Sequence, residues 1–408
     1  MERPLRVLHS FPHRLGMSRI CTTAWHEIDS VVEAGAEMLV MAGDSVRTFP
    51  HPVRVETTMS RGRLRIPYRL LGTERACALH DWLVARRLPS FAGKIDIIHA
   101  WPLGASRTIR AAKRLGIPVV LERCNAHTRF AYEVVQRECE RIGVPLPPSH
   151  EHAYNKTRLE HEENEYAEAD ALLCPSDFVV KTFVDQGFPP GKLFRHQYGF
   201  DEKLFVRGKQ NAESGRGLTM LFVGGCAPRK GVHYALEAWL KSDASRDGQF
   251  LIAGEFIPAY REKLASMLSH SSVKVLGHRT DVPELMRQSD ILVLPSIEEG
   301  SALVTSEARG SGCVLIVSEA AGAICENMKN ALVHPVGDVT ALAGHITLLH
   351  NDRALLRQLR AASLDTINEI TWTAAGIRLL QAYQNVLKAK GLGVRPSKGS
   401  ACLSSSVK

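Results

Sequence analysis

The stretch LPSIEEGSALVTSEARGSGCVLIVSEAAGA, residues 294–323, decides the fold and the chemistry that this sequence predicts. An apolar run stops at Pro295, a loop with a glycine follows, and helical periodicity begins near Ala302. Glu299 lies in the loop, and Glu307 lies about one turn into the helix. Because the first amides of a helix have no partner within it, they face the end of the preceding strand. Two acids and free amides therefore meet where open parallel sheets bind ligands.

Apolar runs alternate with amphipathic stretches along the whole chain, and each run is short enough to be a buried strand. This alternation predicts parallel sheets with helices on both faces, an α/β fold of doubly wound, Rossmann-like domains. The strands expected in the first half are 5–11, 36–43, 95–101, 117–123 and 171–176, with a helix over 105–115. Those of the second half are LTMLFVGG, GQFLIAGE, SVKVLGH, DILVLPS and CVLIVS.

The alternation is interrupted once, by the polar and glycine-bearing segment VRGKQNAESGRG at 206–217. A chain of 408 residues suits two domains of about 200 residues each. We therefore expect an N-terminal domain over 1–205 and a second domain over 206–372. A last helix over 373–388 is expected to cross back onto the first domain, and the small, basic tail over 389–408 to be disordered.

Composition points to an ordinary enzyme that stays inside the cell. The nine cysteines have no paired spacing, which is typical of reduced thiols, and no apolar run approaches a membrane span. We therefore expect a cytoplasmic protein. The net charge is +8, and basic residues crowd one segment of the first half. This segment suggests peripheral contact with anionic membrane or a phosphorylated acceptor, rather than nucleic acid, although a solvated basic face is the simpler alternative. Its arginines are Arg54, Arg61, Arg63, Arg65 and Arg69.

A second stretch, LFVGGCAPRKG at 221–231, predicts an anion site. A strand ends, Gly224 and Gly225 let the backbone approach a ligand, and Arg229 and Lys230 precede a helix. Two cations at a helix start suit a diphosphate. The alternative is a strand–helix turn with two solvated charges. The segment is not a Walker loop, because G-x-x-x-x-G-K-[ST] is absent.

The two acids of the opening stretch suit a nucleotide sugar. A carboxylate accepts hydrogen bonds from two vicinal hydroxyls, so Glu307 is placed for a ribose and Glu299 for a sugar or its phosphate linkage. The alternative for Glu307 is a cap on a neighbouring turn. The loop and helix start between the acids complete the expected donor site with Gly300, Ser301, Ala302 and Leu303.

Together these residues resemble the retaining glycosyltransferases of the GT-B fold, specifically glycosyltransferase family 4, the group 1 transferases. The two-glutamate motif of that family falls on Glu299 and Glu307, and its V-G-x-x-x-x-x-K-G element falls on 223–231. Two departures stand out. Gly225 occupies the place of an arginine that contacts phosphate in many members, and Cys313 the place of a usual proline.

The resemblance implies two Rossmann-like domains around an interdomain cleft and transfer of a sugar, with retention, from a nucleotide-diphospho-sugar. The acceptor would be a saccharide or a lipid-linked saccharide in polysaccharide or glycoconjugate synthesis. No cofactor and no bound metal are implied, since arginine, lysine and helix amides neutralise the leaving diphosphate. The resemblance implies that the catalytic residues are Glu299, Lys230 and Arg229, together with a histidine from the first domain.

This sequence departs from the family pattern at that histidine. Alignment from Pro118 puts the family's histidine position at Cys124, and His127 follows in the same loop. We favour His127 as the group that contacts the sugar, since functional residues concentrate on loops. A turn histidine bonded to its own backbone is the alternative, and His99 is a second candidate. Three further histidines, His150, His152 and His161, invite a metal interpretation, but a solvated acidic helix over this segment is favoured.

Other classes fit the same fold. Nucleotide-sugar 2-epimerases and glycogen-type phosphorylases also use GT-B halves, but the frame of the paired glutamates argues against the former, and no lysine context suggests pyridoxal. A degenerate transferase that only binds nucleotide is the remaining alternative, motivated by Gly225 and the displaced histidine.

Overall fold

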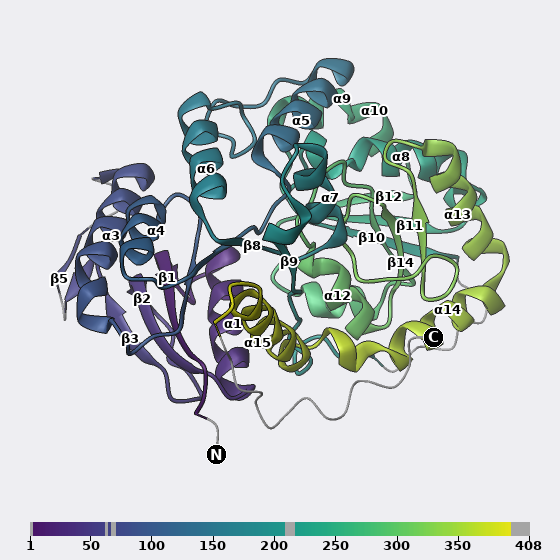
Figure 1. The fold of residues 1–408 in the computed structure, drawn as a ribbon. Coiled ribbons are helices and arrows are strands. Elements are labelled where there is room, and N and C mark those ends of the chain that lie inside the picture. Colours follow the sequence, from purple (N-terminus) through teal and green to yellow (C-terminus); the bar gives the residue numbers. More distant parts are fainter. Residues whose placement is uncertain (1–2, 62–63, 67–70, 209–216, 393–408) are drawn as a thin grey trace.

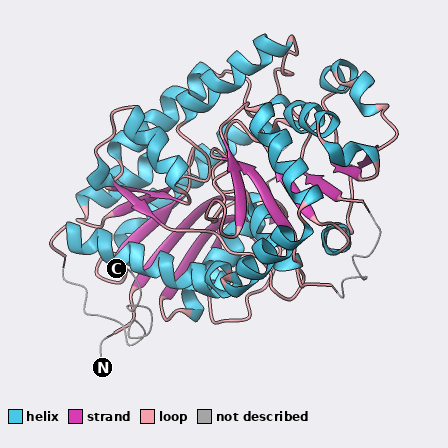
Figure 2. Cartoon of the chain, turned by 90° about the vertical axis from the view of Figure 1, so that its right-hand side faces the viewer, coloured by secondary structure: helices cyan, strands magenta, loops and turns pink. Residues whose placement is uncertain are grey.

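A computed structural model describes residues 3–61, 64–66, 71–208 and 217–392 of the chain. It contains two parallel sheets, each covered on both faces by helices (Figures 1 and 2). The sheets lie in the two halves of the sequence, as the purple-to-blue and green parts of Figure 1 show. The predicted α/β class with two doubly wound, Rossmann-like sheets is confirmed.

The first sheet has seven strands, and every pairing within it is parallel. In spatial order they are β3 (Arg54–Thr57), β2 (Glu37–Ser45), β1 (Arg6–Leu15), β6 (Ile97–Ala100), β7 (Val119–Glu122), β8 (Ala171–Cys174) and β9 (Leu193–Arg195). Its helices are α1 (Ile20–Glu33), α3 (Thr73–Arg87), α4 (Ser106–Arg114), α5 (Thr128–Ile142), α6 (Lys156–Glu168) and α7 (Asp177–Asp185). A short hairpin, β4 (Ser60–Arg61) and β5 (Leu64–Arg65), lies apart from the sheet.

The second sheet has six parallel strands. In spatial order they are β12 (Val273–Gly277), β11 (Gln249–Ala253), β10 (Thr219–Val223), β13 (Ile291–Leu294), β14 (Val314–Ser318) and β15 (Ala331–His334). Its helices are α8 (Val232–Lys241), α9 (Pro258–Lys263), α10 (Ala265–Leu268), α11 (Val282–Arg287), α12 (Leu303–Ser311), α13 (Val339–Asn351) and α14 (Arg353–Asp365).

Strand order reverses at one place in each sheet, and this decides where a ligand can bind. In the second sheet the chain moves outward from β10 to β11 and β12, then returns to β13 on the other side of β10. The loops after β10 and β13 therefore diverge to opposite faces and leave room between them at the carboxyl edge. These two loops are the segments from which the sequence predicts the donor site.

The last helix, α15 (Trp372–Ala389), returns to the first half and packs against α1 (Figure 1). The contact is close at Gly376, where an added Cβ would lie 2.2 Å from the Ser30 carbonyl oxygen. Farther along, the Tyr383 hydroxyl lies 2.7 Å from His99 Nδ1. The chain leaves the first sheet after β9 and enters the second at β10, and residues 209–216 between them lie outside the described residues.

Helix α5 belongs to the first half in sequence but also packs on the second. Val135 and Cys139 are part of the apolar core of the second sheet, and Glu138 Oε1 lies 2.7 Å from His233 Nε2 on α8. The two halves are therefore joined both by α15 and by α5. Among the described helices, none has the length and apolar character required to cross a bilayer. Most of the tail expected to be disordered, residues 393–408, lies outside the described residues.

Candidate active site

The loop after β10 turns sharply and packs on the loop after β13. Gly224 has φ 148°, a value that glycine adopts more readily than other residues. Gly231, with φ 68°, opens α8, and a Cβ there would lie 2.1 Å from the Pro295 carbonyl oxygen. Only glycine allows this approach, so the backbone itself brings Arg229 and Lys230 beside the loop that carries Glu299.

Arg229 and Lys230 pair with acids of the facing loop. Arg229 Nη1 lies 3.2 Å from Glu298 Oε2 and 3.2 Å from Glu299 Oε2, and donates to the Glu298 carbonyl oxygen at 2.8 Å. Lys230 Nζ pairs with Glu299 Oε1, which also accepts from Ser296 Oγ at 3.2 Å. The two cations and two carboxylates thus form one largely buried network.

The network sets the ionisation of its members. Burial acts to raise the pKa of Glu298, but the His152 hydrogen bond and the charge of Arg229 lower it to about 2. Burial also acts on Glu299, and the charges of Arg229 and Lys230 hold its pKa below the ordinary value. Burial lowers the pKa of Lys230, an effect that Glu299 opposes. Both acids are therefore carboxylates at neutral pH.

Glu307 differs from these acids because its carboxylate makes no hydrogen bond or ion pair with any described residue. It lies half-buried in the second turn of α12, and burial raises its pKa to about 7. Nothing among the described side chains compensates for this desolvation. A carboxylate with free acceptor capacity suits a ligand with two neighbouring hydroxyls.

The start of α12 supplies donors. Ala302 is its N-cap and has no side-chain cap, so the first amides of this nine-residue helix lack a side-chain partner. The preceding residue pair, Gly300 and Ser301, leads the backbone into this turn. Gly300 is required sterically, since a Cβ there would lie 1.7 Å from the Cys124 carbonyl oxygen. An uncapped helix start favours anions.

The first half reaches the same loop through residues 124–126 and the segment before α6. The Ala126 amide donates to Glu298 Oε1 at 3.2 Å, and His152 Nε2 lies 3.3 Å from Glu298 Oε2. The Ser176 hydroxyl donates to the Gly300 carbonyl oxygen at 2.5 Å. Glu298 and His152 are functional candidates that the sequence analysis missed, although the doubled acid of SIEEG was an available signal for the first.

His127 caps its own helix, and its contact with a sugar stays a prediction. It is the N-cap of α5, and its Nδ1 accepts from the Arg129 amide at 3.2 Å. Its ring packs among three aromatic rings of the first half, those of Tyr166, Phe183 and Phe188. Burial and the charges of Arg123 and Arg129 lower its pKa to about 3. This is the arrangement of the alternative reading, a histidine bonded to its own helix start.

His99, the second candidate, has a structural position. It is fully buried between Tyr383 and Glu122.

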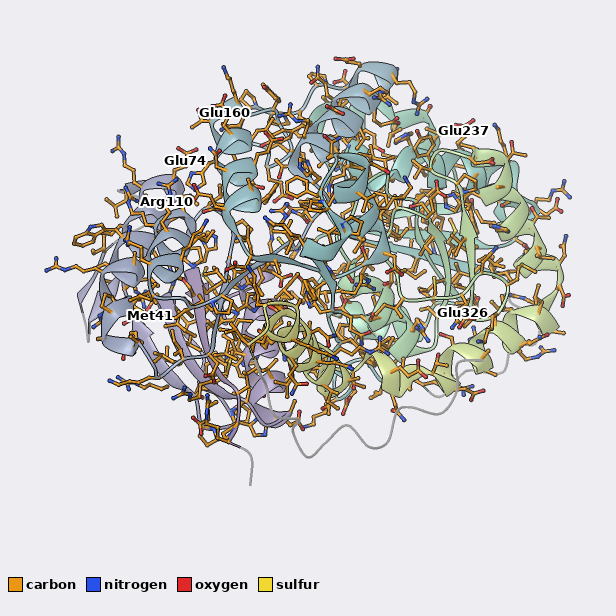
Figure 3. All side chains as sticks on the ribbon, viewed as in Figure 1. Met41, Glu74, Arg110, Glu160, Glu237 and Glu326 are labelled. Atoms are coloured by element: carbon orange, nitrogen blue, oxygen red, sulfur yellow. The ribbon has the colours of Figure 1, made fainter. Side chains whose placement is uncertain are left out.

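The expectation of a solvated acidic helix holds for only part of α6. Glu160 lies on its outer side (Figure 3), whereas Glu162 pairs with Arg123 at 3.2 Å and Glu165 is fully buried. Glu165 is buried because its carboxylate caps α4, accepting from the Ser106 amide at 3.0 Å.

Two family models match the chain, and together they cover both halves. The model described as Glycosyltransferase Family 4 matches residues 22–203, and that described as Glycosyl transferases group 1 matches residues 217–352. The chain belongs to the group 1, or family 4, glycosyltransferases. It is an enzyme of the hexosyltransferase type (EC 2.4), and its fold is GT-B.

Curated relatives are distant but extend over most of the chain. A D-inositol 3-phosphate glycosyltransferase of Stackebrandtia nassauensis is 24% identical over 352 residues, which is 79% of this chain and 76% of that protein. The UDP-Gal:alpha-D-GlcNAc-diphosphoundecaprenol alpha-1,3-galactosyltransferase of Escherichia coli is 24% identical over 271 residues, 64% of this chain and 68% of that protein.

Solved structures share the fold. Sucrose-phosphate synthase from Thermosynechococcus elongatus superposes with a TM-score of 0.67 at 18% identity, covering 95% of this chain and 100% of that one. HepE of Anabaena, solved in complex with UDP-glucose, gives a TM-score of 0.64 at 16% identity, covering 93% and 99%.

A change at Glu307 tests the site. We predict that Glu307→Ala lowers the affinity for a nucleoside diphosphate about 10- to 100-fold, the effect of losing hydrogen bonds to a charged group. Isothermal titration calorimetry measures it, with Glu319→Ala, an exposed acid, as the matched control. Unchanged affinity in Glu307→Ala would refute a ligand role.

The raised pKa of Glu307 gives the prediction a pH dependence. Wild-type affinity should rise from pH 6 to pH 8 more steeply than that of Glu307→Gln, because only the carboxylate accepts from two hydroxyls. Comparison with the variant removes the titration of the ligand's own phosphate.

The same pKa shift lowers the stability of the folded protein as pH rises, whereas it raises the affinity for the ligand. The raised folded pKa means that Glu307 costs stability as pH rises from the ordinary range to about 7, so Glu307→Gln should raise Tm at pH 8 but not at pH 4.

Proposed function

We propose that this glycosyltransferase moves a hexosyl group from a nucleotide-diphospho-sugar to its acceptor with retention of the anomeric configuration. One observation carries the proposal. Two cations, an uncapped helix start and an unpartnered carboxylate converge where strand order reverses in the second sheet. Cations and amides suit the diphosphate, and Glu307 suits the ribose.

The network of ion pairs gives the donor a way to enter. Without ligand, Glu299 neutralises Lys230 and shares Arg229 with Glu298. A diphosphate carries more charge than one carboxylate, so it can take over Lys230 and release Glu299 toward the sugar hydroxyls. Binding would thus exchange the Lys230–Glu299 ion pair for one between Lys230 and the diphosphate, and the sugar hydroxyls would become the hydrogen-bond partners of Glu299.

The same groups act in the reaction. As the bond from the anomeric carbon to the phosphate oxygen breaks, its electron pair passes to the leaving diphosphate. Lys230, Arg229 and the first amides of α12 stabilise that growing negative charge more than they stabilise the ground state. For retention, the acceptor oxygen attacks from the face that the diphosphate leaves and gives its proton to a phosphate oxygen.

The sugar side of the site has two candidate histidines. His127 remains one, although its ring packs against Tyr166, Phe183 and Phe188 and its Nδ1 caps α5. We propose His152 as the second, since its Nε2 lies 3.3 Å from Glu298. Cys124 and Asn125, which pack on Gly300, complete the wall from the first half.

Names of relatives support a sugar nucleotide and a saccharide or lipid-linked acceptor. The Escherichia coli relative is named for UDP-Gal and a diphosphoundecaprenol acceptor, and HepE is solved with UDP and with UDP-glucose. We propose synthesis of a glycoconjugate or polysaccharide on this basis. We also propose that no bound metal takes part in the transfer, since the chain's own cations can neutralise the leaving group.

Lys230 and Arg229 should be needed for turnover. We predict that Lys230→Ala slows transfer by about 10²–10³, the scale seen when one preorganised stabilising donor is lost. Arg229→Ala should show a comparable loss in kcat measured from nucleoside diphosphate release. Lys263→Ala, an exposed cation on α9, is the control and should keep full activity. Wild-type rates in both variants would contradict the proposed leaving-group role.

Gly225 offers a change that should improve the site. It is exposed, no atom lies within 4 Å of an added Cβ, and its φ is outside the positive range. Gly225→Arg should therefore fold normally and, with one added ionic hydrogen bond, tighten nucleoside diphosphate binding about 10-fold. Gly344→Arg, also exposed and open, controls for added charge. Equal or weaker affinity in Gly225→Arg would place the diphosphate elsewhere.

We also propose weak contact with an anionic surface through the basic segment of the first half and the neighbouring helix α3. In the segment, Arg65 and Ile66 are exposed, and on α3 so are Trp82 and Arg86, whose guanidinium lies over the Trp82 ring. Acids reduce the local charge, since Arg54 and Arg87 both pair with Glu56. Arg63 and Arg69 lie outside the described residues, as does the side chain of Arg61.

We predict sedimentation with phosphatidylserine vesicles at low salt, none at high salt, and none with phosphatidylcholine. Each basic residue at an anionic surface contributes roughly 1 kcal/mol, which salt screens. Arg86→Glu should weaken the binding, with Arg279→Glu in the second half as control. Vesicle binding that is absent at low salt would mean that the arginines are only solvated.

A further inference from the structure

A buried bridge of hydrogen bonds joins helix α5 of the first half to helix α8 of the second. It runs from Glu138 on α5 through His233 on α8 to Tyr260 on α9, and each of the three residues is at most 8% exposed. His233 Nε2 lies 2.7 Å from Glu138 Oε1, and His233 Nδ1 bonds to the Tyr260 hydroxyl. None of these three residues belongs to the proposed donor site.

The donors and acceptors of the bridge assign one proton to each bond. The His233 amide is among the first of α8, so it has no partner within the helix, and it donates to the Tyr260 hydroxyl oxygen at 2.9 Å. The hydroxyl proton of Tyr260 is then directed at Nδ1 of His233, and the Nε2 proton at Glu138. A ring protonated on Nε2 alone thus satisfies all three groups.

Glu138 also binds Arg141 of its own helix. Arg141 Nη2 and Nε donate to the two carboxylate oxygens at 2.7 and 3.1 Å. Burial acts to raise the pKa of Glu138, but the hydrogen bonds from His233 and Arg141 lower it to about 2. Glu138 is therefore a carboxylate at neutral pH, and the bond from His233 to it is ionic and stronger than a neutral one.

The bridge adjoins the turn that carries the two cations. That turn, Pro228–Lys230, packs directly on α5, and His233 follows Lys230 by three residues. One of the two residues between them is Gly231, with φ 68°. Because a glycine constrains the backbone little, neighbouring side chains have to fix the position of the turn, and Glu138 is such a neighbour from the first half.

The opposite end of α5 contacts the other loop of the donor site. The Ala126 amide, two residues before the helix begins at Thr128, donates to Glu298 Oε1 at 3.2 Å. One helix of 15 residues therefore reaches both the acids after β13 and the cations after β10. These two contacts set the position of the donor loops relative to the first half.

We infer that His233 is a positioning residue for sugar transfer, which holds Arg229 and Lys230 at a fixed place relative to the first half. The inference rests on the proposed function, in which these cations bind the leaving diphosphate and the sugar is contacted from the first half. Transfer then depends on groups from opposite halves of the molecule. A displacement of about 1 Å between such groups can slow a reaction about 10²-fold.

Separate measurements of rate and affinity test the inference. His233→Leu removes both side-chain bonds but leaves Glu138 paired with Arg141, so no buried charge loses its last partner. The kcat for release of nucleoside diphosphate should fall about 10- to 100-fold. It is measured with whichever of UDP-glucose, GDP-mannose, ADP-glucose and dTDP-glucose the wild type uses fastest. The Kd of the corresponding nucleoside diphosphate, from calorimetry, should change less than about 2-fold, because the cations and Glu307 remain.

Further variants separate positioning from packing. The amide of His233→Gln can still donate to Glu138, so this variant should recover most of the rate. Glu138→Leu should lower kcat as His233→Leu does, and the double variant should be no slower than either, since both changes break one bond. The control is His270→Leu, which changes an exposed histidine of the second half bonded to Ser272 and should keep full activity.

Wild-type kcat in His233→Leu, or a loss of rate matched by an equal loss of affinity, would overturn the inference. If that variant does not fold, Glu138→Leu decides by the same two measurements. Lys230→Ala separates this result from the proposed function, because a slow Lys230→Ala beside a fast His233→Leu removes the positioning role alone. Wild-type protein that releases diphosphate from none of the four donors would contradict the proposed function, and the inference with it.

Discussion

The ion pairs between the cations after β10 and the acids after β13 are the interaction on which the proposed donor site depends. They are possible because β10 and β13 are neighbouring strands, so the segments that follow them meet at the carboxyl edge of the sheet. Gly231 and Pro295 bring the loop backbones into contact, so Arg229 and Lys230 lie beside Glu298 and Glu299. The network pairs both cations with carboxylates of the facing loop.

The loop that carries these acids also contacts the first half of the molecule. Glu298 accepts a hydrogen bond from the Ala126 amide and pairs with His152 of the first half. The Cys124 carbonyl oxygen packs so closely against Gly300 that no side chain would fit there. The loop that holds the ion pairs is therefore also the loop that contacts Ala126 and His152 of the first half.

Patterns local in sequence predicted the fold and the positions of the residues expected to hold a donor, whose role stays a prediction. Buried runs became parallel strands, Gly224 and Lys230 follow β10, and Glu307 lies on α12, as their strand–loop–helix order predicted. His127 shows the limit of such reasoning. Its loop was identified, but the direction of its ring is set by packing against Phe183 and by the start of α5.

Contacts between distant segments could not be predicted. The Ala126 amide and Glu298 are 172 positions apart, and His233 and Glu138 are 95 apart. No periodicity or motif connects such pairs, because their meeting depends on the order of strands in a sheet. The bridge from Glu138 to Tyr260 therefore became visible only in three dimensions.

A structure of the protein with a bound nucleoside diphosphate tests the central claim most directly. The account predicts both ribose hydroxyls within hydrogen-bond distance of Glu307, and diphosphate oxygens in contact with Lys230, Arg229 and the first amides of α12. It also predicts that the Lys230–Glu299 pair is broken in the complex. A nucleotide bound away from α12, or one that leaves the Lys230–Glu299 pair intact, would contradict it.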